Sequence, residues 1–454
     1  MTMTEPWTSV PWREVTDRTG RTYRIGERDT DLLDGRTRTW MTVLPWLATT
    51  ATGAATLAFA TAERHRLGGA LLPLLAIWTA SQATVALPTG HLRETGQVPA
   101  RTAVALGATA ILLSWPFLAY FPNPAAARTL FALLSGAGTA LIWTSCVHTT
   151  IKWHPDRKGS GTGLVAGGLA LGATPFVFLS RELSAYRPEL VAAGALLCVA
   201  VAAAGRPLRD PPRNWWPPHL DPRGATTHRT RAPAPFKGRG ELRDQPPHTR
   251  TNPPAARHLT PRQSRRTPQL WLTWTLLLLT GTTAVFTFAA QVHLHTTPGC
   301  TALAFSAGAY VGGHLSDRHT PRTTLATANA VLAFALLATA ATPNSTAMLI
   351  HGTTAGLAAG ATLPLTAALT ADFFGENHNA VHHGTVLTSG ILSAPVGCFL
   401  GASVVRGTDH GGAYLLAGSI GLVCAVLALL LRAPGRPRVR DILPNPHPLG
   451  EEMA

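Results

Sequence analysis

The chain has 454 residues and a formal net charge of +15, yet only 13% of its residues are charged and 46% are hydrophobic. Such a positive charge raises the question of nucleic-acid binding, but the basic residues stand beside long apolar stretches, where anionic lipid headgroups are the nearer partner. Neither a zinc-type Cys/His spacing nor an aromatic-rich basic stripe accompanies them, so nucleic acid is not an expected partner. The five cysteines form no close pair, which argues against a disulfide framework and against a metal site.

Twelve membrane-spanning helices are predicted from stretches free of Asp, Glu, Lys and Arg, because about 20 apolar residues cross a hydrocarbon core of about 30 Å. In the first half the stretches are Thr39–Ala62, Leu67–Leu92, Thr102–Ala127, Thr129–Ile151, Gly159–Ser180 and the short Leu190–Gly205. In the second half Thr267–Ser316 and Thr323–Ala371 hold two spans each, and Asn377–Val405 and Gly411–Leu431 supply the last two.

Two dividing points are predicted in the second half. His293 and His295 beside Pro298 divide the first long stretch, and Pro343 with Asn344 divides the second. Only about 16 residues run from Pro298 to Gly313, which barely spans the core, so we expect a truncated eighth helix.

The basic residues are sorted to one side of these spans. With both termini inside, 32 of the 38 Lys and Arg fall on inside segments, as expected because basic residues resist translocation. The first 38 residues hold seven basic and seven acidic residues before any apolar run, so no cleavable signal peptide is visible. The sequence predicts a multi-pass protein of the plasma membrane with both termini in the cytoplasm.

A polar segment splits the spans into two sets of six. Residues 206–266 hold 14 basic and four acidic residues with many Pro and His, and such a segment cannot bury enough apolar surface to fold alone. The expected organisation is a cytoplasmic tail at 1–38, a six-helix bundle at 39–205, a basic Pro-rich cytoplasmic loop at 206–267, a second bundle at 268–432 and a cytoplasmic tail at 433–454. The fold class is all-α integral membrane.

The two sets repeat each other, which predicts pseudo-symmetric bundles. Gly90-His91-Leu92-Arg93-Glu94 follows the second span and Gly313-His314-Leu315-Ser316-Asp317-Arg318 follows the eighth, each with a later Pro and Arg. In a latch, the Gly allows close helix contact, the carboxylate meets a neighbouring helix end, and the Arg anchors to the cytoplasmic face. A turn that only fixes topology is the alternative; two copies at matched positions favour the latch. The residues of this latch motif are Gly90, Glu94 and Arg101 in the first half, and Gly313, Asp317, Arg318 and Arg322 in the second.

A further pairing is expected between loops of the two halves. Lys152, Arg157 and Lys158 follow the fourth span, and Asp372 and Glu376 stand at the matching place in the second half. We hypothesise ion pairs between these loops, against the alternative that the cations only set topology and contact lipid.

The second copy of the latch motif resembles the loop motif of the major facilitator superfamily, although Thr320 stands where that family has its second Gly. A narrower resemblance, over most of residues 8–432, is to the oxalate/formate antiporter family, especially its actinobacterial members. The pieces that carry it are Trp78…Gln82 with Pro88-x-Gly90-x-Leu92-Arg93-Glu94, Lys152-Trp153-x-Pro155-Asp156-Arg157 with Thr162-Gly163 and Gly167-Gly168, Asp210-Pro211-Pro212-x-Asn214-Trp215-Trp216-Pro217, and Phe374-Gly375-Glu376-Asn377.

The resemblance implies a transporter that works by alternating access about a central site, with small carboxylates as candidate substrates. Relatives that resemble the oxalate carrier place an Arg in helix eight and a Lys in helix eleven. These positions read Ala309 and Ile391 here. A carboxylate near the midplane needs a positive partner, so the loss of both cations suggests a different or neutral substrate, or a carrier that has lost its activity.

Uncharged polar and aromatic groups remain as candidates for lining the solute path: Trp78, Gln82, Trp143, Gln291 and Tyr310. Trp and Tyr are equally at home in the headgroup belt. His148 and His351 lie near span ends and are expected at the interface, and without a carboxylate relay, uniport or exchange is favoured over proton symport.

The sequence thus predicts a monomeric transporter of a small organic solute, with no cofactor and no catalytic residue. Two alternatives stay open. One is a degenerate carrier that serves as a membrane receptor or scaffold. The other, a membrane-embedded enzyme, lacks any visible cluster of carboxylates, His or nucleophiles at one depth.

Overall fold

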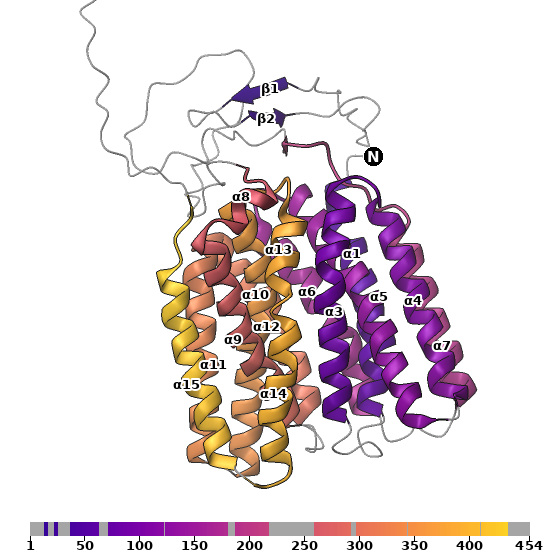
Figure 1. Cartoon of the computed structure of the whole chain (residues 1–454), viewed down its shortest axis with the longest axis vertical. Helices are drawn as coiled ribbons and strands as arrows, with labels where there is room; N and C mark the ends of the chain where they lie inside the picture. The colour runs from indigo at the N-terminus through magenta and orange to yellow at the C-terminus, as the bar shows by residue number, and fades with distance from the viewer. Residues whose placement is uncertain are drawn as a thin grey trace, which may run out of the picture.

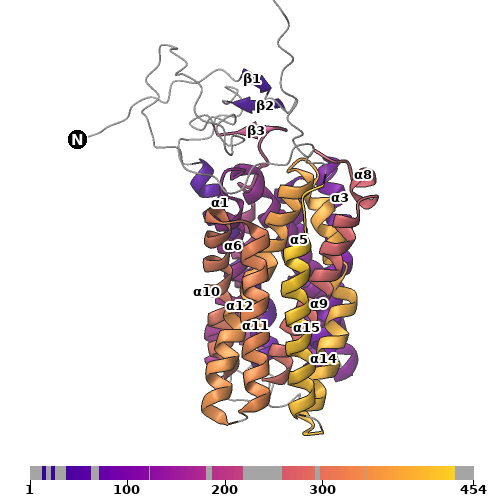
Figure 2. The same ribbon diagram turned by 90° about the vertical axis from the view of Figure 1, so that its left-hand side faces the viewer.

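The computed structural model describes residues 13–16, 22–25, 37–62, 71–121, 123–179, 187–217, 258–291, 297–342, 344–408 and 410–434. These residues form one bundle of long helices with a small sheet at one end (Figures 1 and 2). We call that end the hairpin end. Helix α1 begins there and α15 ends there (Figure 1), as expected for an even number of spans. His293 and His295 lie outside the described residues.

The N-terminal half contains six long helices. They are α1 (Thr37–Ala62), α3 (Leu71–Glu94), α4 (Ala100–Tyr120), α5 (Pro124–Trp153), α6 (Lys158–Leu179) and α7 (Arg187–Gly205). Asn123 caps α5, because its side chain accepts hydrogen bonds from the N–H groups of Ala125 and Ala126.

The C-terminal half repeats this plan beside the first half (Figure 1). A short helix, α8 (Pro261–Arg265), precedes α9 (Pro268–Ala290), α10 (Thr297–Arg318), α11 (Pro321–Ala341), α12 (Ser345–Phe374), α13 (Asn379–Leu387), α14 (Gly390–Val405) and α15 (His410–Leu430). Helices α13 and α14 follow one another and together form one span-length segment, Asn379–Val405.

The bundle has the surface of a multi-pass membrane protein. Among the described residues, eight helical segments are long and apolar enough to cross a membrane, and α1, α6, α7 and α10 run alongside them (Figures 1 and 2). Large apolar side chains point outward, including Phe399, Leu196 and Phe334, which are 75%, 71% and 65% exposed. Outward apolar side chains are what a lipid-facing surface requires.

The expectation of a truncated eighth helix was wrong. Helix α10 begins at Thr297 and has 22 residues, about 33 Å at 1.5 Å per residue. The expected length was counted only as far as Gly313, whereas the helix continues through the latch motif to Arg318. Pro298 is its second residue. Proline is tolerated there because the first N–H groups of a helix have no partner within the helix.

A three-stranded sheet lies across the hairpin end (Figure 2). Strand β1 (Arg13–Thr16) pairs antiparallel with β2 (Thr22–Ile25), and β2 pairs in parallel with β3 (Trp215–Trp216). The polar loop that was expected not to fold alone thus begins with an ordered segment that is held by the N-terminal hairpin and the helices. Trp216 is only 1% exposed.

Candidate functional site

The two halves meet backbone to backbone at the glycines of the latch motif. A Cβ on Gly90 of α3 would lie 2.3 Å from the carbonyl oxygen of Ala380 in α13, and a Cβ on Gly313 of α10 would lie 2.2 Å from that of Gly159 in α6. No side chain fits at either place. Each copy of the motif therefore brings a helix of its own half against a helix of the other half.

The carboxylate of each copy receives N–H groups at the start of the helix that it meets. Asp317 accepts hydrogen bonds from the backbone N–H groups of Gly159 and Ser160, both at 2.8 Å. Glu94 accepts one from the N–H of Ala380 at 3.3 Å. The first N–H groups of a helix have no partner within it and carry a partial positive charge, so a carboxylate there stabilises the contact.

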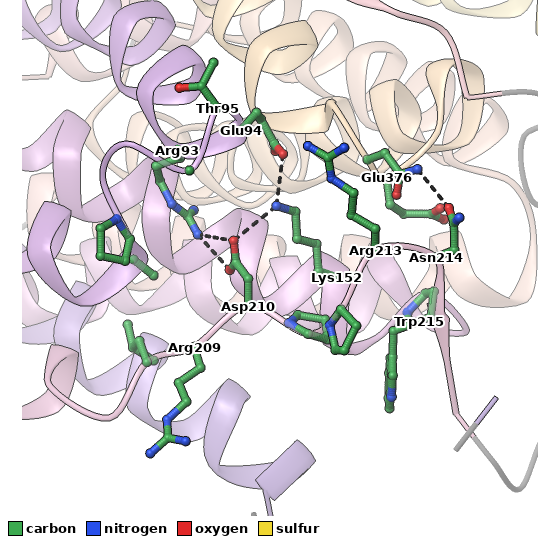
Figure 3. Close-up of a pocket in the computed structure, with 18 of the residues that line it drawn as sticks. Arg93, Glu94, Thr95, Lys152, Arg209, Asp210, Arg213, Asn214, Trp215 and Glu376 are labelled. Carbon is green, nitrogen blue, oxygen red and sulfur yellow. Dashed lines mark hydrogen bonds and ion pairs between the residues drawn. The ribbon is translucent and has the colours of Figure 1, made fainter. Parts of the chain in front are cut away.

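Beside the first copy, four charged side chains form a network at the hairpin end (Figure 3). The Arg93 guanidinium donates to both oxygens of Asp210, at 2.7 and 2.8 Å. The Lys152 ammonium lies 3.1 Å from both Asp210 and Glu94. Burial alone would raise the pKa of Asp210, but Arg93 and Lys152 hold it well below its ordinary value. Asp210 is therefore ionised.

A second ion pair joins the two halves directly. Lys158, at the start of α6, lies 2.8 Å from Asp372 and 2.7 Å from Glu376 of the C-terminal half. This bears out the hypothesised pairing for Lys158 alone. Lys152 pairs within its own half, and Arg157 lies 3.6 Å from its neighbour Asp156.

The segment Asp210–Trp216, which we call the strap, crosses the hairpin end. The Trp153 indole donates to the carbonyl oxygen of Arg209 at 2.7 Å and packs edge-on against Trp215. On the other side, Asn377 of the C-terminal half donates to the Asn214 side chain at 2.8 Å. Asn214 has a φ of 63°, a conformation that Asn tolerates better than most residues. The strap thus connects the two halves and β2.

A pocket of about 690 Å³ opens beside the strap. Its lining includes the network of Arg93, Lys152, Asp210 and Glu94, together with Arg213 (Figure 3). The charged groups of the network are paired with one another. The arrangement can therefore hold the two halves together, and breaking it would separate them at this end.

The remaining latch residues lie around this contact. Arg101 and Arg318 are exposed, and Arg322 is half-buried. In the second copy of the motif, Asp317 is held by the start of α6.

The residues predicted to line a solute path do not gather in one place. Trp78 and Gln82 are half-buried one turn apart on α3, whereas Trp143 is 4% exposed and packed in the core of the first half. Gln291 accepts a hydrogen bond from Thr301 at 2.6 Å and ties α9 to α10. Tyr310 is 50% exposed and stacks on His314.

The two positions at which the resembled family has cations differ in environment. Ala309 is fully buried. A Cβ added to Gly163 of α6 would lie 2.4 Å from the carbonyl oxygen of Ala309. Ile391, on α14, is 40% exposed. Ala309 is therefore a helix-packing residue in this structure, and an Arg at that position would have to enter the α6–α10 contact.

His148, expected at the membrane interface because it lies near a span end, is packed inside the bundle. It is 1% exposed and its ring lies against that of His383 from the other half, while its depth in the membrane stays a prediction. His351 is half-buried. Reading position along a span could not show which face of α5 carries His148, and that face is the one that meets α13.

Several residues of the contact were present in the sequence motifs without an assigned role, notably Arg93, Asp210, Asn214 and Asn377. Arg93 and Asp210 are 117 residues apart, so no local pattern joins them. The signal that could have found them was a carboxylate next to two prolines and two tryptophans in a segment otherwise basic and polar.

Comparisons with known proteins agree with this architecture. Residues 293–451 match the Major Facilitator Superfamily. The chain is 30% identical over 77 residues to the oxalate:formate antiporter of Oxalobacter formigenes, a match that covers 17% of this chain and 18% of that protein. The chain thus spans less than a fifth of the length of this relative.

Solved transporters share the fold over most of the chain. The human organic anion transporter MFSD10 (TETRAN) superposes with a TM-score of 0.60 at 13% identity, over 87% of this chain and 100% of its own. The E. coli fucose:proton symporter FucP gives 0.57 at 14% identity, over 87% and 98%. FucP in an outward conformation gives 0.53 at 15% identity, over 86% and 99%. At these identities the likeness establishes the fold.

Proposed function

We propose that this chain, whose residues 293–451 match the Major Facilitator Superfamily, moves a small organic solute across the plasma membrane by alternating access, with the hairpin end facing the cytoplasm. The sorting of basic residues to the segments at that end supports this orientation. The match to the superfamily supports a transport role.

The observation that carries the proposal is the duplicated contact between the halves at the hairpin end. The contact closes that end through two glycine crossings, two carboxylate caps and one buried ion pair between halves. All of these join elements of different halves, so rocking one half against the other would break them together. Packed interfaces of this kind are bistable instead of continuously deformable, which is what a gate requires.

For the substrate class, we propose a small organic solute, with small carboxylates as one candidate class. The relative found in the sequence comparison is an oxalate:formate antiporter, and one structural neighbour is an organic anion transporter. Against a dicarboxylate stands the absence of a cation at Ala309 and Ile391. A neutral solute fits that absence better, because even a single buried carboxylate would need a positive partner.

The test is exchange in proteoliposomes that contain the full chain, with labelled oxalate, formate, a monocarboxylate and a neutral solute. Asn214 and Asn377 are both changed to Cys, and a short thiol-specific cross-linker then ties the strap to the C-terminal half. We expect uptake of at least one solute by the native chain and its loss on cross-linking, with either single Cys variant as the control. Uptake that persists after cross-linking would refute the gate.

The second candidate function is a carrier that has lost transport and serves as a receptor or scaffold. It is favoured by the complete burial of Ala309 at the close α6–α10 contact, where the resembled family has a cation. It predicts that the native chain transports none of the tested solutes and that the bundle stays in one conformation.

A further inference from the structure

A pair of buried imidazoles lies between the two halves, just inside the proposed gate. His148 of α5 is 1% exposed and His383 of α13 is fully buried. Their ring centroids are 5.3 Å apart and the rings meet edge-on. His148 precedes Lys152 by four residues in α5, so the pair lies one helical turn, about 5 Å, deeper than the charged network.

The hydrogen bonding of this pair is incomplete. His148 Nδ1 lies 3.2 Å from the side-chain nitrogen of Asn379. Within the described part of the chain, His148 Nε2, both ring nitrogens of His383 and the Asn379 side-chain oxygen have no hydrogen-bond partner. Buried polar groups are nearly always paired, so four unpartnered atoms in one cluster call for an explanation by function.

Asn379 is suited to both protonation states of His148. As placed, its NH₂ group donates to a neutral ring nitrogen. When the amide is rotated by half a turn, its oxygen can accept a hydrogen bond from a protonated ring nitrogen. The two orientations of the amide occupy nearly the same space. Turning would give up a long hydrogen bond, 3.4 Å, from the amide nitrogen to the carbonyl oxygen of Ala367, but no bond of its oxygen. The cluster can therefore take up a proton without rearranging its backbone.

The closed contact opposes that proton through its charges. From α3, Arg93 donates to the carbonyl oxygens of Thr144 and Ser145, on the turn before His148. From α5 itself, Lys152 faces the same network, and Asp210, the anion of the strap, is already paired with both cations. On α13, His378 and His382 pack against each other, and Glu94 caps the first turn. A buried imidazolium beside two cations is unfavourable.

We propose that His148 and His383 form a proton-binding site that is filled when the hairpin end opens, so that a proton from that side stabilises the open state. This inference rests on the proposed function only in that the two halves separate at this end. Separation would carry His148 away with α5 and His383 away with α13, and water would then reach both rings. A solvated imidazole takes up a proton near pH 6.5.

The linkage sets the size of the effect. Because the open state binds a proton that the closed state does not, the ratio of open to closed molecules rises as the pH falls below about 6.5. The rise is up to about tenfold per pH unit for one linked proton.

The experiment measures the gate itself and needs no solute. Nitroxide labels are placed on Gln97→Cys in the loop after α3 and on Arg262→Cys in α8, both exposed positions in different halves, in a full chain whose native cysteines are replaced by alanine. Double electron–electron resonance then gives the distribution of distances between the labels at pH 8 and at pH 5.5. We expect the longer distance to gain population at pH 5.5.

The variants separate this site from other titrating groups. The double substitution His148→Gln/His383→Gln should abolish the pH response while each single substitution weakens it, and His91→Gln, an exposed histidine at the same end of α3, should leave it intact. No pH response in the parent chain, or a full response in a folded double variant, would overturn the proposal. If the double variant does not fold, an undiminished response in both single variants would overturn it. Transport can fail in proteoliposomes while the pH response holds, and the reverse, so the two proposals are tested apart.

Discussion

The buried Lys158 should control how long the hairpin end stays closed. Its side chain is only 6% exposed and lies within 2.8 Å of Asp372 and Glu376, which are 11% and 10% exposed. Lys158→Met keeps most of the volume but leaves two carboxylates buried without a cation. Removing one partner of a buried pair costs about 3–5 kcal/mol, and each 1.4 kcal/mol is a factor of about ten in an equilibrium constant. The population ratio of the closed to the open state should therefore fall by roughly two to three and a half powers of ten.

The distance between labels at Gln97 and Arg262 reports this shift, and the neighbouring Arg157 supplies the control. The Arg157 side chain is 61% exposed and makes only a 3.6 Å contact with Asp156, so Arg157→Met should change the distribution little. Adding Asp372→Asn and Glu376→Gln to Lys158→Met removes the stranded charges and should restore much of the closed population. If Lys158→Met leaves a folded chain with the parent distribution, the buried pair does not hold the halves together.

Three further outcomes follow from the same contacts. Gly90→Ala should destabilise the closed state, because its Cβ would lie 2.3 Å from a backbone oxygen of α13. Gly411→Ala is the control, because a Cβ there meets nothing within 4 Å. Equal accessibility of the hairpin end to a thiol reagent in the two variants would count against this prediction. Asn214→Ala should raise the rate at which Asn377, changed to Cys, reacts with such a reagent, and an unchanged rate would remove the strap from the gate. Burial, aided by the nearby Arg38, lowers the pKa of His154 to about 3. Its neutral form therefore stabilises the fold above pH 6.5, and this contribution falls as the pH drops from 6.5 toward 3. Between pH 7 and pH 5 the free energy of unfolding of the parent chain should fall by about 2 kcal/mol more than that of His154→Gln, which would be measured as a larger drop in thermal stability in detergent.

The helical frame could be predicted because a lipid core imposes one length and one polarity on every span. Counting uncharged stretches therefore located the long helices to within a few residues, for example α5 at Pro124–Trp153 against a predicted Thr129–Ile151. The division near Pro298 is confirmed, since α9 ends at Ala290 and α10 begins at Thr297. The expected shortness of the eighth helix was wrong, because the helix does not end at Gly313 but continues to Arg318.

The site could be predicted only where its residues are close in sequence. The latch motif is local, so its glycines and carboxylates could be picked out from spacing. Asp210, by contrast, meets Arg93 and Lys152 only because α7 returns the chain to the hairpin end, and His148 meets His383 across 235 positions. Such pairs depend on which face each helix turns inward. A helix rich in Ala, Gly and Thr has little hydrophobic asymmetry from which to read that face.

The two copies of the latch motif have diverged in how they hold the gate. In the second copy, Asp317 relies on the start of α6 and its Ser160 hydroxyl, which is a short-range contact. In the first copy, Glu94 shares Lys152 with Asp210, and Asp210 belongs to the strap, which also reaches Asn377. When the hairpin end opens, the first copy therefore moves with the strap and the buried imidazoles one turn below, whereas the second copy parts from the start of α6. This asymmetry at Glu94 places any sensing of the cytoplasm on the α3–α13 side of the gate.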